Sequence, residues 1–123
     1  MAALLEPLGT RSRFEAALTP ATRTASENGP AVDLLDCDGP VMALVQLGEV
    51  GEEMTLAVGF QESVNGTTWS SIAGSAVPDL AAESLVLHTF ERTKRHLRCQ
   101  VTLTGDDPTV TLAVLVGQVV KVF

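Results

Sequence analysis

Alternation of apolar and polar residues with a period of two is the feature that most constrains the fold of this chain. In the segment MTLAVGFQE, residues 54–62, every second residue from Met54 to Phe60 is apolar and would point to one side of a strand. Comparable short runs follow in SLVLHTF, HLRCQVTLT and TVTLAVLVG, separated by turn-forming groups such as TGDDP. No long helical period lies between them, so the sequence predicts an all-β domain.

The number of such runs defines the expected architecture. About eight strands in 123 residues are enough for one domain and too few for two, which predicts an antiparallel β-sandwich of jelly-roll type. The run 110–116 is apolar on both faces, which predicts a strand that lies centrally or is covered by a partner. The residues expected in the core are Leu56, Val58, Phe60, Leu97, Cys99, Val101, Leu112 and Val114.

Two Asn-Gly pairs indicate hairpins. The first is Asn28-Gly29, followed by Pro30, and the second is Asn65-Gly66 in FQESVNGTTWSSI. Asn and Gly tolerate the positive φ angles that tight hairpin turns require. We expect a strand to end at Glu62 and the next to begin near residue 68, so that Trp69 covers the end of the core.

The first nineteen residues differ from the rest. Pro7 and Gly9 interrupt any long element, and only the patch 14–18 is compatible with a short helix. We therefore divide the chain into an extended N-terminal arm, residues 1–19, and a β-sandwich domain, residues 20–123. The arm residues expected to contact a partner are Leu4, Leu5, Leu8, Arg11, Arg13 and Phe14.

Charge and cysteine content exclude several classes of function. The formal net charge of −7 repels phosphate, so we expect no nucleic-acid binding. Two cysteines make no disulfide framework, and Cys99 alternates with apolar residues as a small buried side chain would. The longest apolar run is far shorter than the ~18 residues of a membrane span, and the N-terminus does not resemble a signal peptide. We expect a soluble protein assembled in a cytoplasm, without a membrane partner.

The sequence contains no recognisable catalytic, phosphate-binding or metal-binding motif. The two histidines, His88 and His96, have no nucleophile or acid at a known motif spacing, and no glycine-rich phosphate loop is present. Three acidic residues, Asp33, Asp36 and Asp38, resemble the start of a calcium loop but lack its remaining ligands. We expect no catalytic residues, no cofactor and no bound metal.

A cluster of basic residues, FERTKRHLR, stands out on so acidic a chain. It contains Arg92, Lys94, Arg95 and Arg98, which are four of the eight basic residues. Two interpretations remain open. The charges either balance nearby carboxylates within the domain, or form a docking patch for an acidic protein surface through directional hydrogen bonds. In the second case Arg92, Lys94 and Arg95 contact the partner.

Three stretches, ATRTASENGPAVDL, FQESVNGTTWSSI and KRHLRCQVTLTG, occur in an order that resembles small capsid decoration proteins of tailed bacteriophages, also called cement proteins. The likeness runs from about residue 20 to 117. The chain departs from the family at Val64-Asn65, where an acidic residue commonly precedes the turn glycine, and at His96, where an aromatic is common. The hairpin is also similar to one in discoidin-like sugar-binding sandwiches.

The resemblance implies a structural virion protein, assembled in the host cytoplasm, that binds the outer surface of the phage head and clamps major capsid protein subunits together. Capsid lattices present symmetric sites, so we expect a homotrimer, or alternatively a homodimer. A carbohydrate-binding module and a tail or baseplate component are the alternative functions.

Overall fold

The computed structural model describes residues 12–35, 37–80 and 83–120. Within these residues every regular element is a strand, as the alternating pattern predicts. Three of the strands have only two residues each, and the others have between four and fourteen. The strands are β1 (Ser12–Arg23), β2 (Glu27–Asn28), β3 (Val32–Asp33), β4 (Cys37–Val50), β5 (Met54–Ser63), β6 (Ser70–Ser71), β7 (Val77–Leu80), β8 (Ser84–Phe90), β9 (His96–Gly105) and β10 (Val110–Val120).

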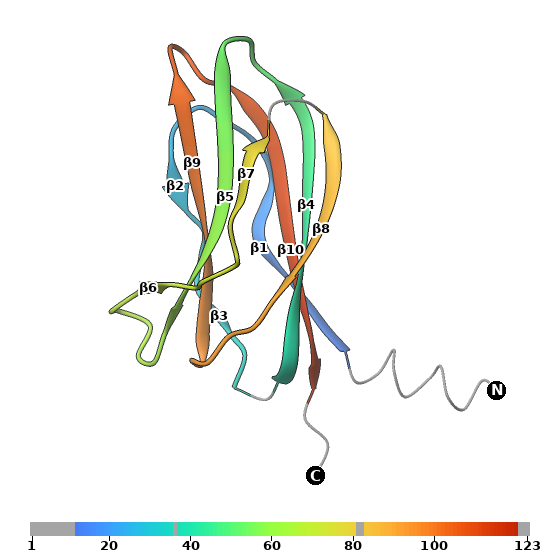
Figure 1. Cartoon of the computed structure of the whole chain (residues 1–123), viewed down its shortest axis with the longest axis vertical. Coiled ribbons are helices and arrows are strands. Elements are labelled where there is room, and N and C mark those ends of the chain that lie inside the picture. Colours follow the sequence, from blue (N-terminus) through green and yellow to red (C-terminus); the bar gives the residue numbers. More distant parts are fainter. Residues whose placement is uncertain (1–11, 36, 81–82, 121–123) are drawn as a thin grey trace, which may run out of the picture.

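The strands form two antiparallel sheets, which lie side by side in the view of Figure 1, with β9 and β5 on the left and β10, β4 and β8 on the right. The first sheet has the order β1-β10-β4-β8. The second has β9 and β5 at its centre, with β2 and β3 pairing to β9, and β6 and β7 pairing to β5. The predicted all-β antiparallel fold is confirmed. The chain crosses repeatedly between the sheets, as a jelly roll does, but several strands are very short, so the finer jelly-roll assignment stays a prediction.

The core lies between the two sheets and is built from the inward side chains of the long strands. All eight residues predicted for it are buried, with at most 1% of their surface exposed. The central position of β10, between β1 and β4, also agrees with its apolar run. Burial of β-branched and aliphatic side chains at alternate positions is therefore the main stabilising term of this fold.

The predicted boundary between arm and sandwich is wrong. Residues 12–19 are not part of an arm, because they lie in β1, which pairs with β10 along its whole length. Ala17 and Leu18 belong to the buried core. The short helix considered at 14–18 is likewise a strand. The rest of the predicted arm, residues 1–11, lies outside the described residues.

The first predicted hairpin is also wrong. Instead of pairing with each other around Asn28-Gly29, β2 and β3 both pair with β9, as two pieces of one interrupted strand. The interruption brings the backbones of the two sheets together: Gly29 donates its N–H to the carbonyl of Cys99 at 2.8 Å, and a Cβ at this position would overlap the carbonyl oxygen of Ala17. Glycine is required here by close approach rather than by a turn.

The second predicted hairpin is present with a wider loop. Gln61 and Glu62 in β5 pair with the two residues of β6. Between them, the side-chain oxygen of Asn65 accepts the backbone N–H groups of Thr67 and Thr68 at 2.9 Å each, and Gly66 has a φ of 78°. Trp69 lies in this loop and is partly exposed, so its predicted place at the end of the core is wrong.

Candidate docking surfaces

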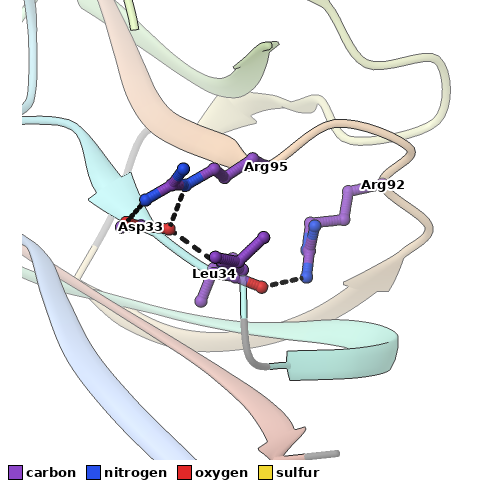
Figure 2. A network of polar contacts seen from close by, with 5 residues as sticks. Asp33, Leu34, Arg92 and Arg95 are labelled. Carbon is purple, nitrogen blue, oxygen red and sulfur yellow. Dashed lines mark hydrogen bonds and ion pairs between the residues drawn. The ribbon is translucent and has the colours of Figure 1, made fainter. Parts of the chain in front are cut away.

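The basic segment, residues 92–98, consists of most of the loop between β8 and β9 and the first three residues of β9, and it lies at one end of the sandwich. Its first arginine points into the protein. Arg92 donates to the carbonyl oxygens of Leu34, Cys37 and Lys94 at 2.5, 2.8 and 2.8 Å, and to the side-chain oxygen of Gln118 at 2.8 Å. Figure 2 shows Arg92 reaching the carbonyl of Leu34. Its guanidinium donors are engaged within the fold, and the docking role that the second interpretation of the basic cluster assigns to Arg92 stays a prediction.

The second arginine of the segment forms an ion pair at the surface (Figure 2). Arg95 holds Asp33 through two hydrogen bonds, of 2.9 Å from Nε and 2.6 Å from Nη2. This hydrogen-bonded pairing, assisted by the backbone N–H of Leu35, holds the pKa of the Asp33 carboxyl well below its usual range. Both side chains remain nearly half exposed, at 45% and 44%, so an external carboxylate still has access to Arg95.

The backbone of the segment is anchored by Glu62, a residue that the sequence analysis did not single out. Its carboxylate is buried, and it accepts the backbone N–H groups of Thr93 and Lys94 at 2.7 and 3.2 Å and the hydroxyl of Thr93 at 3.0 Å. A buried carboxylate needs such donors to offset its loss of hydration. Lys94 in turn donates its ammonium to the hydroxyl of Ser70 at 3.0 Å.

The last arginine of the segment covers the only tryptophan. The guanidinium carbon of Arg98 lies 4.5 Å from the centre of the Trp69 ring, within the range of a cation–π interaction, and its Nε donates to Gln61 at 2.7 Å. One face of the ring is therefore occupied by the protein's own cation. This arrangement removes one of the two faces that a sugar ring would use as a platform.

A hollow of about 330 Å³ opens beside the basic segment. Arg92 and Gln118, which line it, are already hydrogen-bonded to each other and to backbone carbonyls. Of the basic side chains that line the hollow, Arg95 is therefore the one left accessible to a partner, because the donors of Arg92 are already used within the protein. The residues that line it are Leu35, Cys37, Gly39, Glu91, Arg92, Thr93, Arg95 and Gln118.

The structure places only part of the predicted arm site. Leu4, Leu5, Leu8 and Arg11 lie outside the described residues. Of Arg13 only the backbone is described, in register with Gln118. Phe14 is placed on the outer side of β1, where 59% of its surface is exposed and its ring lies over Gly117.

Phe14 belongs to a larger apolar surface, the outer face of the β1-β10-β4-β8 sheet, which the sequence analysis did not identify as a site. In one row across all four strands, Ala16 is in register with Leu115, Leu115 with Leu44, and Leu44 with Leu87. Leu85, Leu87 and Leu115 are 64%, 65% and 41% exposed. The signal was present in the run 110–116, whose apolar residues occupy both faces. We call this surface the apolar face.

No other chemistry is found in the described residues. They contain no group of three or more histidine, cysteine, aspartate or glutamate side chains that could hold a metal ion. The predicted absence of a metal at Asp33, Asp36 and Asp38 therefore stays a prediction, since Asp36 is not described. No helix in the described part of the chain is long and apolar enough to span a membrane.

No protein-family model matches this chain, and no curated protein does. Among solved structures, the PBSX exported protein XepA is similar over 90% of this chain, with a TM-score of 0.63 and 19% identity. A chain of the T13 IBDV viral particle is similar over 89% of this chain, with a TM-score of 0.51 and 12% identity. This chain spans only 38% and 31% of the lengths of those two chains. At such identities the likeness shows the fold: this chain is an all-β antiparallel domain of a kind also found within an exported PBSX protein and within a viral particle.

Proposed function

We propose that this chain is a structural virion protein of a tailed bacteriophage. In this proposal it binds the outer surface of the head and stabilises contacts between major capsid protein subunits. It is supported by the resemblance of three sequence stretches to decoration proteins, and by a fold that also occurs in a viral particle. The role needs no catalytic residues, and it needs a rigid domain that presents surfaces to neighbouring subunits.

The observation that carries the proposal is the meeting of the three resembling stretches at one end of the sandwich. Asp33, from the first stretch, pairs with Arg95, from the third. From the second stretch, Glu62 accepts the N–H of Lys94, and Trp69 lies under Arg98. Residues of all three stretches therefore lie together at this end of the sandwich, as expected if the stretches serve one common contact.

The capsid contacts that we propose differ in one residue from those expected from the sequence. Lys94 and Arg95 remain candidates, because their hydrogen bonds to Ser70 and Asp33 are exposed and can be exchanged for those of a partner. Arg92 is withdrawn, since its guanidinium is engaged internally. Residues 1–11, with Leu4, Leu5, Leu8 and Arg11, are proposed as the second contact, together with Arg13 and Phe14 at the start of β1.

Binding of the full chain to purified heads that lack it tests the proposal. We expect a copy number comparable to that of the major capsid protein, and much weaker binding after deletion of residues 1–11. Lys94→Ala/Arg95→Ala should bind with a smaller dependence on salt concentration, whereas the charge-conserving Lys94→Arg/Arg95→Lys pair should keep that dependence. Wild-type binding by the deletion variant would remove the arm from the proposal.

A tail or baseplate component of similar fold is separated from a decoration protein by location. Mass spectrometry of purified heads and purified tails from the same lysate distinguishes them. Recovery in tails at low copy number, with none in heads, would overturn the proposed function.

The carbohydrate-binding alternative depends on Trp69. Arg98 covers one face of the Trp69 ring. If the ring binds sugar, glycan binding should become stronger in Arg98→Ala, which uncovers that face, and should be lost in Trp69→Ala. A glycan-array signal in the wild type that is lost only in Trp69→Ala, with folding intact, would favour this alternative.

A further inference from the structure

We propose that the apolar face is a self-association surface, on which a second copy of this chain packs sheet against sheet around a twofold axis. The inference concerns how copies of the protein contact each other. It uses neither residues 1–11 nor the basic segment, and it shares only Phe14 with the proposed attachment to a phage head.

The two outward surfaces of the sandwich differ in chemistry. On the β9-β5 sheet the outward positions are mainly polar: Thr55 faces Thr104, Ala57 faces Thr102, and Gln61 faces Arg98. This is the ordinary pattern of an antiparallel sheet with one solvated side. On the β1-β10-β4-β8 sheet the corresponding positions are mainly apolar, and one apolar row, Ala16, Leu115, Leu44 and Leu87, crosses all four strands. A central strand that is apolar on both sides is expected where both sides are covered.

The size of the apolar face suits a small interface. Four strands about 4.8 Å apart, each with about six residues rising ~3.3 Å, present a projected area of roughly 400 Å². Monomeric proteins rarely leave apolar patches larger than a few hundred Å² uncovered. Specific interfaces bury about 800 Å² per partner, so a face of this size predicts a reversible dimer that depends on concentration rather than a permanent one.

Charge favours a second copy as the occupant. The chain carries a net charge of −7, so most pairings of its surface with itself set carboxylates against carboxylates. The outward side chains in the middle of the apolar face are uncharged, and include Met42, Gln46 and Thr89 beside the leucines, whereas the carboxylates of Glu49 and Glu83 lie at one end of it. This face can therefore meet its own copy with no like charges opposed at the centre.

Shape gives the orientation of the two copies. On β8, Leu85 and Leu87 protrude from the face, whereas β1, at the opposite edge, carries the small Ala16, and a largely apolar hollow of about 160 Å³ lies between Pro20 of β1 and residues of β10 and β4. A twofold axis parallel to the central strands β10 and β4 sets β8 of one copy over β1 of the other. The protruding leucines of each copy then lie over the small residues and the hollow of the other.

A charge placed on the face tests the surface. Sedimentation of the full chain over a range of concentrations should show a monomer–dimer equilibrium. Leu87→Glu should raise the dissociation constant by about 100-fold or more, because two carboxylates would be buried near each other in an apolar contact. Val64→Glu is the matched control, since Val64 is 71% exposed in the β5–β6 loop of the other sheet, and it should leave the equilibrium unchanged.

Cross-linking tests the orientation. In one chain, Ala16 and Leu87 lie on the two edge strands, about 14 Å apart at three strand spacings, too far for a disulfide within the molecule. In the proposed dimer they lie opposite each other. Since packed sheets lie about 10 Å apart, a short thiol-to-thiol cross-linker should join chains of the Ala16→Cys/Leu87→Cys variant into covalent dimers, and neither single variant should form them efficiently. The native Cys37 and Cys99 are buried and do not compete.

Three outcomes would overturn the inference. A wild-type protein that is monomeric at every concentration shows that no second copy binds. A monomer that dimerises or binds an apolar dye only after deletion of residues 1–11 shows that this segment covers the face. A dimer that Leu87→Glu leaves intact uses another surface. In each case, capsid binding by the same proteins is measured separately, so failure here is distinct from failure of the proposed function.

Discussion

Arg92 and Gln118, which are 26 residues apart, are joined by a hydrogen bond of 2.8 Å between Nε of the arginine and Oε1 of the glutamine. The same guanidinium also holds the carbonyls of Leu34 and Cys37, 58 and 55 residues away along the chain. One side chain therefore connects β10, the segment between β3 and β4, and its own loop. This makes Arg92 a residue of the fold that sits within a surface of exposed charges.

Substitution of Arg92 should accordingly reduce stability. Arg92→Ala leaves several partly buried acceptors without a donor, and we expect a loss of about 3 kcal/mol in the free energy of unfolding. Arg92→Lys should recover little, because an ammonium cannot reproduce the planar set of donors. Arg95→Ala, which breaks an exposed pair, is the control and should cost under about 1 kcal/mol. Urea titrations compare the three; equal losses for both alanine variants would contradict the internal role of Arg92.

Gly29 and Gly117 should respond differently to the same added methyl group. A Cβ at Gly29 meets the backbone carbonyl of Ala17, which cannot move without disturbing β1, so Gly29→Ala should cost about 1–3 kcal/mol. A Cβ at Gly117 meets the ring of Phe14, a largely exposed side chain that can rotate away, so Gly117→Ala should cost much less. Thermal melts of the two variants measure which substitution lowers the melting temperature more. The reverse order would mean that the contact between the sheets at Gly29 is misplaced.

The Asp33–Arg95 pair predicts a dependence on pH. The pKa of Asp33 is lower in the folded protein than the usual value near 4, so the pair contributes stability above that pH. The contribution begins to be lost as pH falls below about 4, when the unfolded carboxyl takes up a proton. The difference in melting temperature between wild type and Asp33→Asn should therefore be largest near neutral pH and shrink towards pH 2. A difference that stays constant over this range would show that the lost interaction is not ionic.

The thiol of Cys99 should be inert in the folded protein. Burial raises its pKa to about 12, so almost none is present as the reactive thiolate at pH 8. In a Cys37→Ala background, labelling of Cys99 by a thiol reagent should be negligible in buffer and should rise with urea along the unfolding transition. Rapid labelling without denaturant would show that β9 opens locally.

The core could be predicted from the sequence because the alternation of side chains along a strand depends on that strand alone. The runs 54–60 and 97–101 show the pattern without interruption, and the alternate apolar residues of both runs are buried as expected. The start of β1 could not be found in this way, because register shifts on both sides of Leu18 break its alternation and make the segment 14–18 compatible with a helix.

The candidate surfaces were less accessible to sequence reasoning. Whether Arg92 faces inward depends on acceptors that are far away in the chain, such as Leu34 and Gln118, and no local spacing reveals them. Similarly, the alternating leucines of β8 show that one side of the strand is apolar. They do not show that Val86 turns inward with Phe90 and that Leu85 and Leu87 face solvent, since this depends on which side of the sheet the second sheet covers.

The position of β1 has a mechanical consequence. This edge strand follows residues 1–11 directly in the chain, and it runs antiparallel to β10 (Figure 1). Its ladder hydrogen bonds are perpendicular to the strand, so tension applied at Ser12 along the strand loads them together in shear rather than opening them one by one. If the first eleven residues grip a neighbouring subunit, β1 would transmit that load into the sandwich as a tether that resists slipping.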